Sequence, residues 1–128
     1  MDLILDTHCI LWYALDDSQL SSKAKAAIEG EENEVYVSPA SYWEIAIKIC
    51  TGKYKLESPF EAFWNQAIQD GEMAILPIQI AHAGRLLELP MLHRDPFDRM
   101  LVAQALCEKL IVVSNDSMLD QYHVQRIW

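Results

Sequence analysis

A long apolar helix followed at once by an apolar strand constrains the fold more than any other part of the sequence. The predicted helix spans residues 96–109, begins at Asp95-Pro96, and is apolar on most faces, so we expect it to pack deep in the structure. The predicted strand spans Leu110–Ser114 and is apolar on both sides, which is typical of the centre of a parallel sheet. A strand of this kind needs helices on both faces of its sheet.

The rest of the chain repeats this alternation. We predict further strands at residues 3–5, 35–38 and 73–78, and helices at 8–15, 21–30, 39–51, 59–69, 81–89 and 118–122. Ser38-Pro39 and Ser58-Pro59 each combine a capping serine with a proline suited to the first helical position. Strands separated by helices predict an α/β fold with a parallel sheet. At 128 residues we expect one domain, spanning 1–128.

The charge balance excludes one broad class of function. Nineteen acidic residues against ten Lys and Arg give a net charge of −9. Such a chain has no excess of basic residues for sequence-independent binding to nucleic acid through a basic face. The balance remains compatible with a nuclease whose carboxylates hold metal ions.

The cysteines, the histidines and the N-terminus predict a cytoplasmic protein. Cys9, Cys50 and Cys107 have apolar neighbours, and we expect them to be reduced core thiols. None of the four histidines has the spacing of a zinc site. No apolar run approaches the length of a membrane span, and Met1 leads directly into a charged residue, so we expect no signal peptide.

Four carboxylates are predicted to face one edge of the sheet. Two end strands and two lie in the first turns of helices: Asp6, Asp116, Glu44 and Asp98. Ligands of open parallel sheets gather beyond the carboxyl ends of the strands. Carboxylates that converge there repel one another unless a cation lies among them, and oxygen ligands suit Mg²⁺ or Mn²⁺. Since such metals activate water and neutralise phosphate charge, the pattern predicts hydrolysis of phosphodiester bonds.

These acids also have structural interpretations. Asp98 lies three residues after the expected helix cap Asp95, where the helix dipole alone favours an acid. Glu44 has Lys48 four residues later, which is the spacing of a surface ion pair, although its apolar neighbours favour an inward acid. Asp116 fits a turn or a helix cap. The acid that ends the first strand is hardest to explain in this way, because a carboxylate there needs a partner.

Four segments resemble the successive motifs of a PIN domain. They are Leu5-Asp6-Thr7-His8, Ser41–Ile45 (SYWEI), His93–Ala105 (HRDPFDRMLVAQA) and Val113–Asp116 (VSND). The segment around Asp98 is the most specific of them, whereas an Asp-Thr pair after a strand is weak alone. Over its whole length the chain closely resembles the VapC-like toxins of bacterial type II toxin–antitoxin systems.

The resemblance implies a three-layer α/β/α sandwich with a five-stranded parallel sheet in the order 3-2-1-4-5. It implies a Mg²⁺- or Mn²⁺-dependent endoribonuclease that cleaves RNA, with a metal site made by Asp6, Glu44, Asp98 and Asp116 and with Thr7 hydrogen-bonding beside them. It further implies a homodimer and an antitoxin protein that covers the active cleft. Nearby Arg94, Arg99 and Lys48 are candidates for binding phosphate or for ion pairing.

Two other protein classes fit this sequence less well, and one non-catalytic alternative stays open. A phosphatase with an aspartate nucleophile needs a second Asp where this chain has His8. A response-regulator receiver domain needs an acidic pair after its first strand, but Asp16-Asp17 lie between two predicted helices. The alternative that stays open is a non-catalytic RNA-binding or protein-interaction module whose acids serve only the fold or partner contacts.

Overall fold

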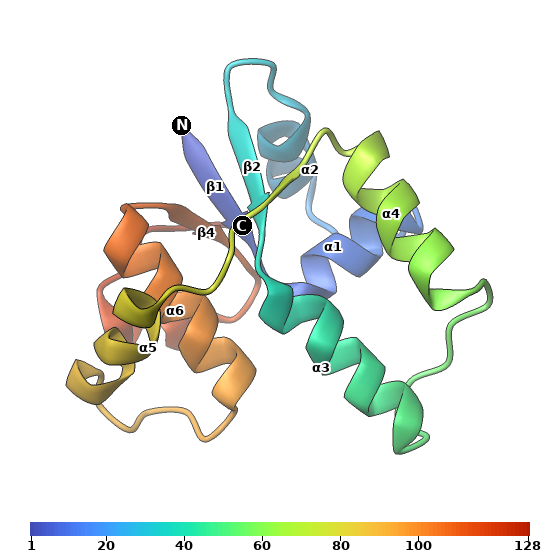
Figure 1. The fold of residues 1–128 in the computed structure, drawn as a ribbon. Coiled ribbons are helices and arrows are strands. Elements are labelled where there is room, and N and C mark those ends of the chain that lie inside the picture. The colour runs from blue at the N-terminus through green and yellow to red at the C-terminus, as the bar shows by residue number, and fades with distance from the viewer.

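The sheet of this protein has five parallel strands in the order β3-β2-β1-β4-β5 (Figure 1). A computed structural model describes residues 1–128, and its strands are β1 (Asp2–Leu5), β2 (Glu34–Val37), β3 (Ala74–Ile75), β4 (Ile111–Val113) and β5 (Arg126–Ile127). Every pairing between neighbouring strands is parallel. The predicted fold class and the strand order implied by the resemblance are therefore confirmed.

Helices cover both faces of the sheet. One face packs against α1 (Thr7–Ala14), α2 (Ser22–Glu29), α3 (Pro39–Cys50) and α4 (Phe60–Asp70). The other packs against α6 (Pro96–Glu108) and the 3₁₀ helix η2 (Ser117–Tyr122), with α5 (Ile80–Arg85) and the 3₁₀ helix η1 (Leu86–Glu88) against α6 (Figure 1). None of these helices has both the length and the apolar composition that crossing a membrane requires.

The two hydrophobic cores follow from the alternation of side chains along the central strands. Leu3 and Leu5 of β1 enter the core with α1, α2, α3 and α4, whereas Ile4 between them enters the core with α6 and η2. Neighbouring β4 likewise sends Val113 to the first core and Val112 to the second. Strands buried on both faces must be apolar throughout, as the sequence of this region is.

Serine caps are present at two of the predicted helix starts, whereas the predicted Ser58 cap is wrong: α4 begins at Phe60 after Pro59 and has no side-chain cap. The Ser21 hydroxyl accepts a hydrogen bond from the Ala24 amide at 3.0 Å, and the Ser38 hydroxyl accepts one from the Ala40 amide at 3.1 Å. Pro39 occupies the first turn of α3, where its missing N–H costs no hydrogen bond. These caps set the direction in which α2 and α3 leave the loops before them.

Three elements are shorter or less regular than predicted. The strand expected at 73–78 is limited to Ala74–Ile75 at the edge of the sheet, close to Pro77, which has no N–H to donate. The helix expected at 81–89 divides into α5 and η1, and the helix expected at 118–122 is the 3₁₀ helix η2. The predicted locations are correct, but the apolar pattern of such short segments does not determine their geometry.

The prediction that all three cysteines are core thiols is wrong for two of them. Cys9 is buried in α1, and burial raises the pKa of its thiol. Cys50 and Cys107 are exposed because they lie at the C-terminal ends of α3 and α6, on sides that do not face the sheet. Apolar neighbours in sequence did not predict burial here, since adjacent residues of a helix point in different directions.

Candidate functional site

Two acids lie where the central strands end. Asp6 follows β1, and its backbone N–H donates to the carbonyl of Val113 in β4 at 3.0 Å. Asp6 is only 8% exposed, and its carboxylate accepts a hydrogen bond from the Ser114 hydroxyl at 2.6 Å. The Ser114 oxygen also accepts the Asp116 amide at 3.0 Å. One serine therefore links the acids that follow β1 and β4.

Glu44 is brought to the same edge by α3. It is buried, and its Oε1 accepts a hydrogen bond from the Thr7 hydroxyl at 2.8 Å while its Oε2 pairs with Lys48 at 2.8 Å. Because the single Thr7 proton goes to the carboxylate, the Ser41 hydroxyl donates to Thr7 across their 2.9 Å contact. Glu44 is thus both an inward acid and the partner of an ion pair, as its two sequence interpretations predicted.

The start of α6 supplies two acids with different positions. Asp95 is the helix cap, and its carboxylate accepts the amides of Phe97 at 2.8 Å and Asp98 at 3.4 Å. Asp98 lies three residues further along, in the first turn of α6, and is half-buried. The aromatic rings of Trp43 and Phe97 pack edge to face, 5.2 Å apart, which fixes this end of α6 against α3. The predicted capping role of Asp95 is confirmed.

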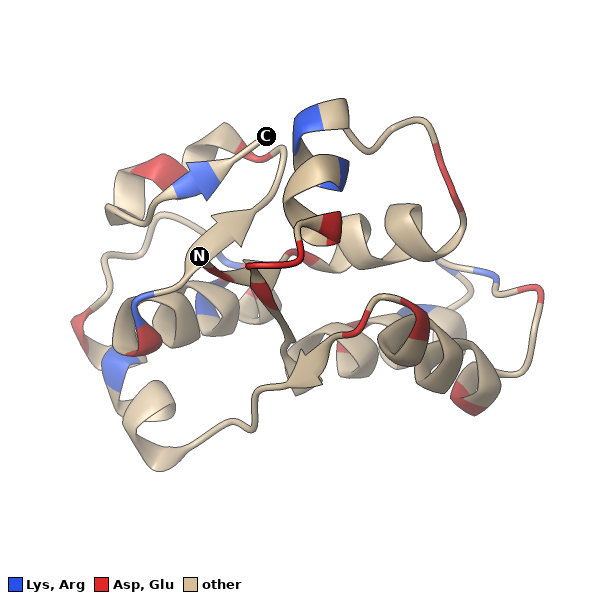
Figure 2. Ribbon diagram, turned by 90° about the horizontal axis from the view of Figure 1, so that it is seen from above, with Lys and Arg blue, Asp and Glu red and all other residues tan.

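The structure brings all four predicted acids into one small cavity. Its volume is about 350 Å³, and its lining has no hydrophobic residue: Asp6, His8, Glu44, Lys48, Asp95, Asp98, Asn115 and Asp116. Acidic positions outnumber basic ones over the whole chain, and Lys and Arg are scattered over several elements (Figure 2). Few positive charges lie near the acids of the cavity: Lys48 and His8 line it, and Arg126 is close enough to Asp116 to interact with its charge.

One histidine joins the acids at this edge. Ligand atoms of His93, Asp98 and Asp116 all lie within 4.8 Å of one another. The His93 side chain is 11% exposed, and its Nε2 is 3.4 Å from Oδ2 of Asp116. The sequence pattern assigned His93 no role in the site. The only sequence feature that points to His93 is its position two residues before the cap of α6, within the segment that resembles the PIN motif.

Burial and neighbouring negative charges strongly raise the pKa of Asp98. Burial is the largest cause that raises its pKa to about 7, and four carboxylates add to it: Asp6, Asp95, Glu44 and Asp116. Burial also raises the pKa of Asp6, against the opposing effect of the Ser114 hydrogen bond. Carboxylates held this close with little compensating charge are the donor set that a hard divalent cation prefers.

The three basic candidates differ in what they contact. Lys48 is bound to Glu44, and that hydrogen bond raises the pKa of its ammonium group. Arg99 donates to the carbonyls of Pro90 at 2.8 Å and Leu86 at 3.2 Å, so it ties the loop before α6 to η1. Arg94 is exposed and makes no hydrogen bond or ion pair. Of the three, only Arg94 has a side chain that no protein contact holds.

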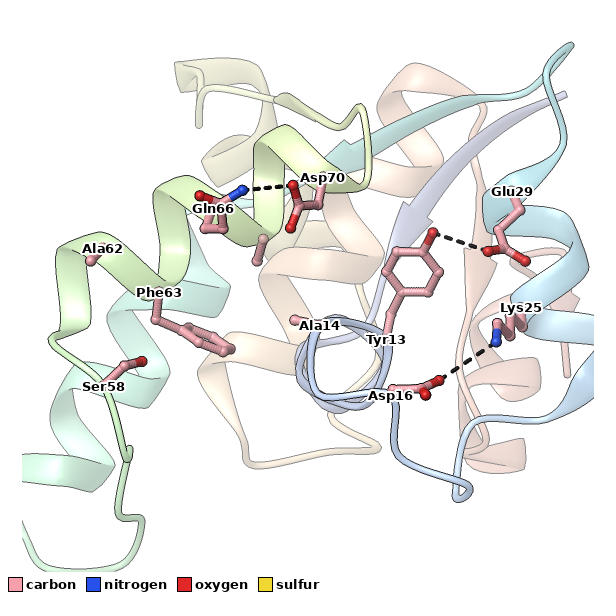
Figure 3. A pocket seen from close by; sticks show the side chains of 11 residues that line it. Tyr13, Ala14, Asp16, Lys25, Glu29, Ser58, Ala62, Phe63, Gln66 and Asp70 are labelled. Atoms are coloured by element: carbon pink, nitrogen blue, oxygen red, sulfur yellow. Dashed lines mark hydrogen bonds and ion pairs between the residues drawn. The ribbon is translucent and has the colours of Figure 1, made fainter.

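A larger cavity lies away from the acids. It measures about 520 Å³ and lies between α1, α2 and α4, where Tyr13 and Phe63 contribute apolar surface (Figure 3). The ion pair between Lys25 and Asp16, 3.6 Å apart, lies across one end of this cavity. Since its three acids, Asp16, Glu29 and Asp70, contact other protein side chains, this cavity has no cluster of free carboxylates.

The chain matches a known protein family over almost its whole length. The family model of the PIN domain matches residues 3–124. The chain therefore belongs to the PIN domain family. A search of curated protein sequences finds no match.

Solved structures share the fold over almost the whole chain. A chain from the crystal structure of VapBC2 from Rickettsia felis, bound to a DNA fragment from their promoter, has a TM-score of 0.76 and 13% identity, covering 99% of this chain and 98% of that one. VapBC-1 from nontypeable Haemophilus influenzae gives 0.66 and 14%, covering 99% and 97%. FitAcB from Neisseria gonorrhoeae gives 0.65 and 16%, covering 98% and 96%. At these identities the likeness establishes the fold.

Proposed function

We propose that this protein is a metal-dependent endoribonuclease, the VapC-like toxin of a toxin–antitoxin pair, formed by a single PIN domain over residues 1–128. The observation that carries the proposal is the meeting of Asp6, Glu44, Asp98 and Asp116 in one wholly polar cavity at the carboxyl edge of a PIN-domain sheet. Fixed carboxylates with this little compensating charge are costly unless they bind a cation. A purely structural role for the four acids does not explain why Asp98 is left without a partner of opposite charge.

The residues present fit Mg²⁺ or Mn²⁺. Asp98 and Asp116 are close enough to share an ion, and Asp6 and Glu44 line the same cavity. A divalent cation bound there supplies charge that stabilises a phosphate undergoing hydrolysis and favours deprotonation of water. The protein supplies the orientation of its carboxylates, because hydroxyl groups of Thr7 and Ser114 each hold one of them.

Cleavage of a mixed RNA pool tests this proposal. We expect cleavage in Mg²⁺ or Mn²⁺, its loss in EDTA, and its return when metal is added back, because the carboxylates that line the cavity need a cation to act on a phosphate. RNA cleavage that continues unchanged after exhaustive chelation would contradict the metal-dependent mechanism. Failure both to cleave RNA and to bind Mn²⁺ would favour the non-catalytic alternative.

Partners follow from the relatives and from exposed apolar surface. The structurally similar proteins include VapBC and FitAcB toxin–antitoxin assemblies, which supports an antitoxin protein as partner. Trp43 is 60% exposed and Ile47 is 38% exposed on α3, which supports a homodimer that covers them. RNA is the proposed substrate, and the cytoplasm is the proposed location of the protein.

A further inference from the structure

Hydrogen bonds hold His93 from two sides. The Tyr122 oxygen lies 2.9 Å from the backbone nitrogen of His93 and 3.1 Å from its ring Nδ1. On the other side of the ring, Nε2 lies 3.4 Å from Oδ2 of Asp116. Tyr122 is buried, and its ring centroid is 5.3 Å from that of the imidazole. The imidazole therefore has little freedom to turn.

The contacts of Tyr122 and Asp116 together favour one tautomer of the imidazole. A backbone N–H can only donate, so the Tyr122 oxygen accepts from the His93 amide and its own proton is free to donate to Nδ1. A neutral imidazole that accepts at Nδ1 carries its proton on Nε2. Since a carboxylate can only accept, the contact with Asp116 requires the same arrangement: Nε2–H donates to Oδ2.

We propose that His93 is the positioning residue of the metal site, and that its Nε2–H, fixed by Tyr122, holds the Asp116 carboxylate toward Asp98. This inference rests on the proposed function. Oδ1 of Asp116 accepts the Met118 amide at 3.0 Å, so each oxygen has one hydrogen bond and keeps a further lone pair. Partners that hydrogen-bond to a ligating carboxylate fix its orientation and strengthen metal binding.

Mn²⁺ calorimetry on the full chain tests the role of His93. Loss of a partner of this kind typically weakens metal affinity by 10–100-fold, so we expect His93→Ala to weaken Mn²⁺ binding about tenfold. His93→Gln places an amide N–H near the position of Nε2 and is expected to restore most of the affinity. Met91→Ala is the matched control, because Met91 is 77% exposed in the same loop, and its Mn²⁺ affinity should equal that of the wild type.

Nitrogen-15 NMR of the metal-free protein tests the proton directly. We expect the His93 resonances of the Nε2–H tautomer, and the Nδ1–H tautomer would overturn the proposal. Wild-type affinity in His93→Ala, or a His93→Gln variant as weak as His93→Ala, would also overturn it, since neither result is compatible with a hydrogen-bond donor at this position. If the wild type binds no Mn²⁺, both the proposed function and the role of His93 are wrong. If the wild type binds Mn²⁺ and His93→Ala binds it equally well, only the role of His93 is wrong.

Discussion

Asp98→Asn is expected to lower the rate of RNA cleavage in Mn²⁺ by more than about 100-fold, because loss of a metal ligand should exceed the 10–100-fold effect of losing a supporting residue. Asn has nearly the shape of Asp but no charge with which to hold a cation. Burial and four neighbouring carboxylates raise the pKa of Asp98 to about 7, the clearest such shift among the acids of the site. A bound cation would therefore stabilise the ionised form of Asp98 most.

Asp95→Asn is the matched control, three residues away on the same helix turn. Asp95 accepts the amides of Phe97 and Asp98, and an Asn oxygen makes the same cap at similar stability. We expect this variant to keep most of its cleavage activity when both proteins are assayed on one RNA at equal metal concentration. Loss of activity in Asp95→Asn with activity kept in Asp98→Asn would show that the roles of the two acids are reversed.

The metal-free protein is expected to lose stability as the pH rises from about 4 to about 7. The Asp98 carboxyl has a pKa of about 7 in the folded state against an ordinary value of 3.8. The folded state therefore binds a proton that the unfolded state releases over this range, so the cost of ionising Asp98 is absent below pH 4 and complete above pH 7. Asp98→Asn removes that cost and should melt at a higher temperature than the wild type at pH 8.

Thermal melts in EDTA measure the difference. Asp98 is partly exposed, so solvent screening reduces the effect, and relief of about 1 kcal/mol would raise the midpoint by about 4 °C in a domain of this size. The gain should be larger at pH 8 than at pH 5, and added Mn²⁺ should reverse it because only the wild type gains stability from the ion. Glu57→Gln, which removes a charge from an exposed loop, should show neither change. A less stable Asp98→Asn with an unchanged response to metal would contradict the acidic site.

The sequence was sufficient for the fold because the central strands carry a strong pattern. β1 and β4 are buried on both faces, and only a parallel sheet covered by helices accommodates such strands next to the apolar helix α6. β3 and η2 were predicted less well, since segments of two to six residues have few side chains with which to express a periodicity. Their geometry depends on neighbouring elements that the local sequence does not describe.

The candidate site was predictable to the extent that topology determines it. Asp6 and Asp116 follow adjacent parallel strands, so the strand order alone brings them to one edge. His93 was not predictable, because its loop has no regular structure and its position depends on Tyr122, 29 residues later in the chain. Ser114 directly follows β4 and contacts Asp6, so the strand order also brings it to this edge, but the hydrogen bond of its hydroxyl was not predicted.

The position of Mn²⁺ in crystals grown or soaked with the ion tests the central claim most directly, because anomalous scattering locates the metal without any assumption about activity. The prediction is a metal peak in the cavity at the carboxyl edge of the sheet, in contact with carboxylate oxygens of Asp98 and Asp116 in the wild type and absent from Asp98→Asn. A peak elsewhere on the protein, or an equal peak in Asp98→Asn, would contradict the assignment of these acids as the metal site.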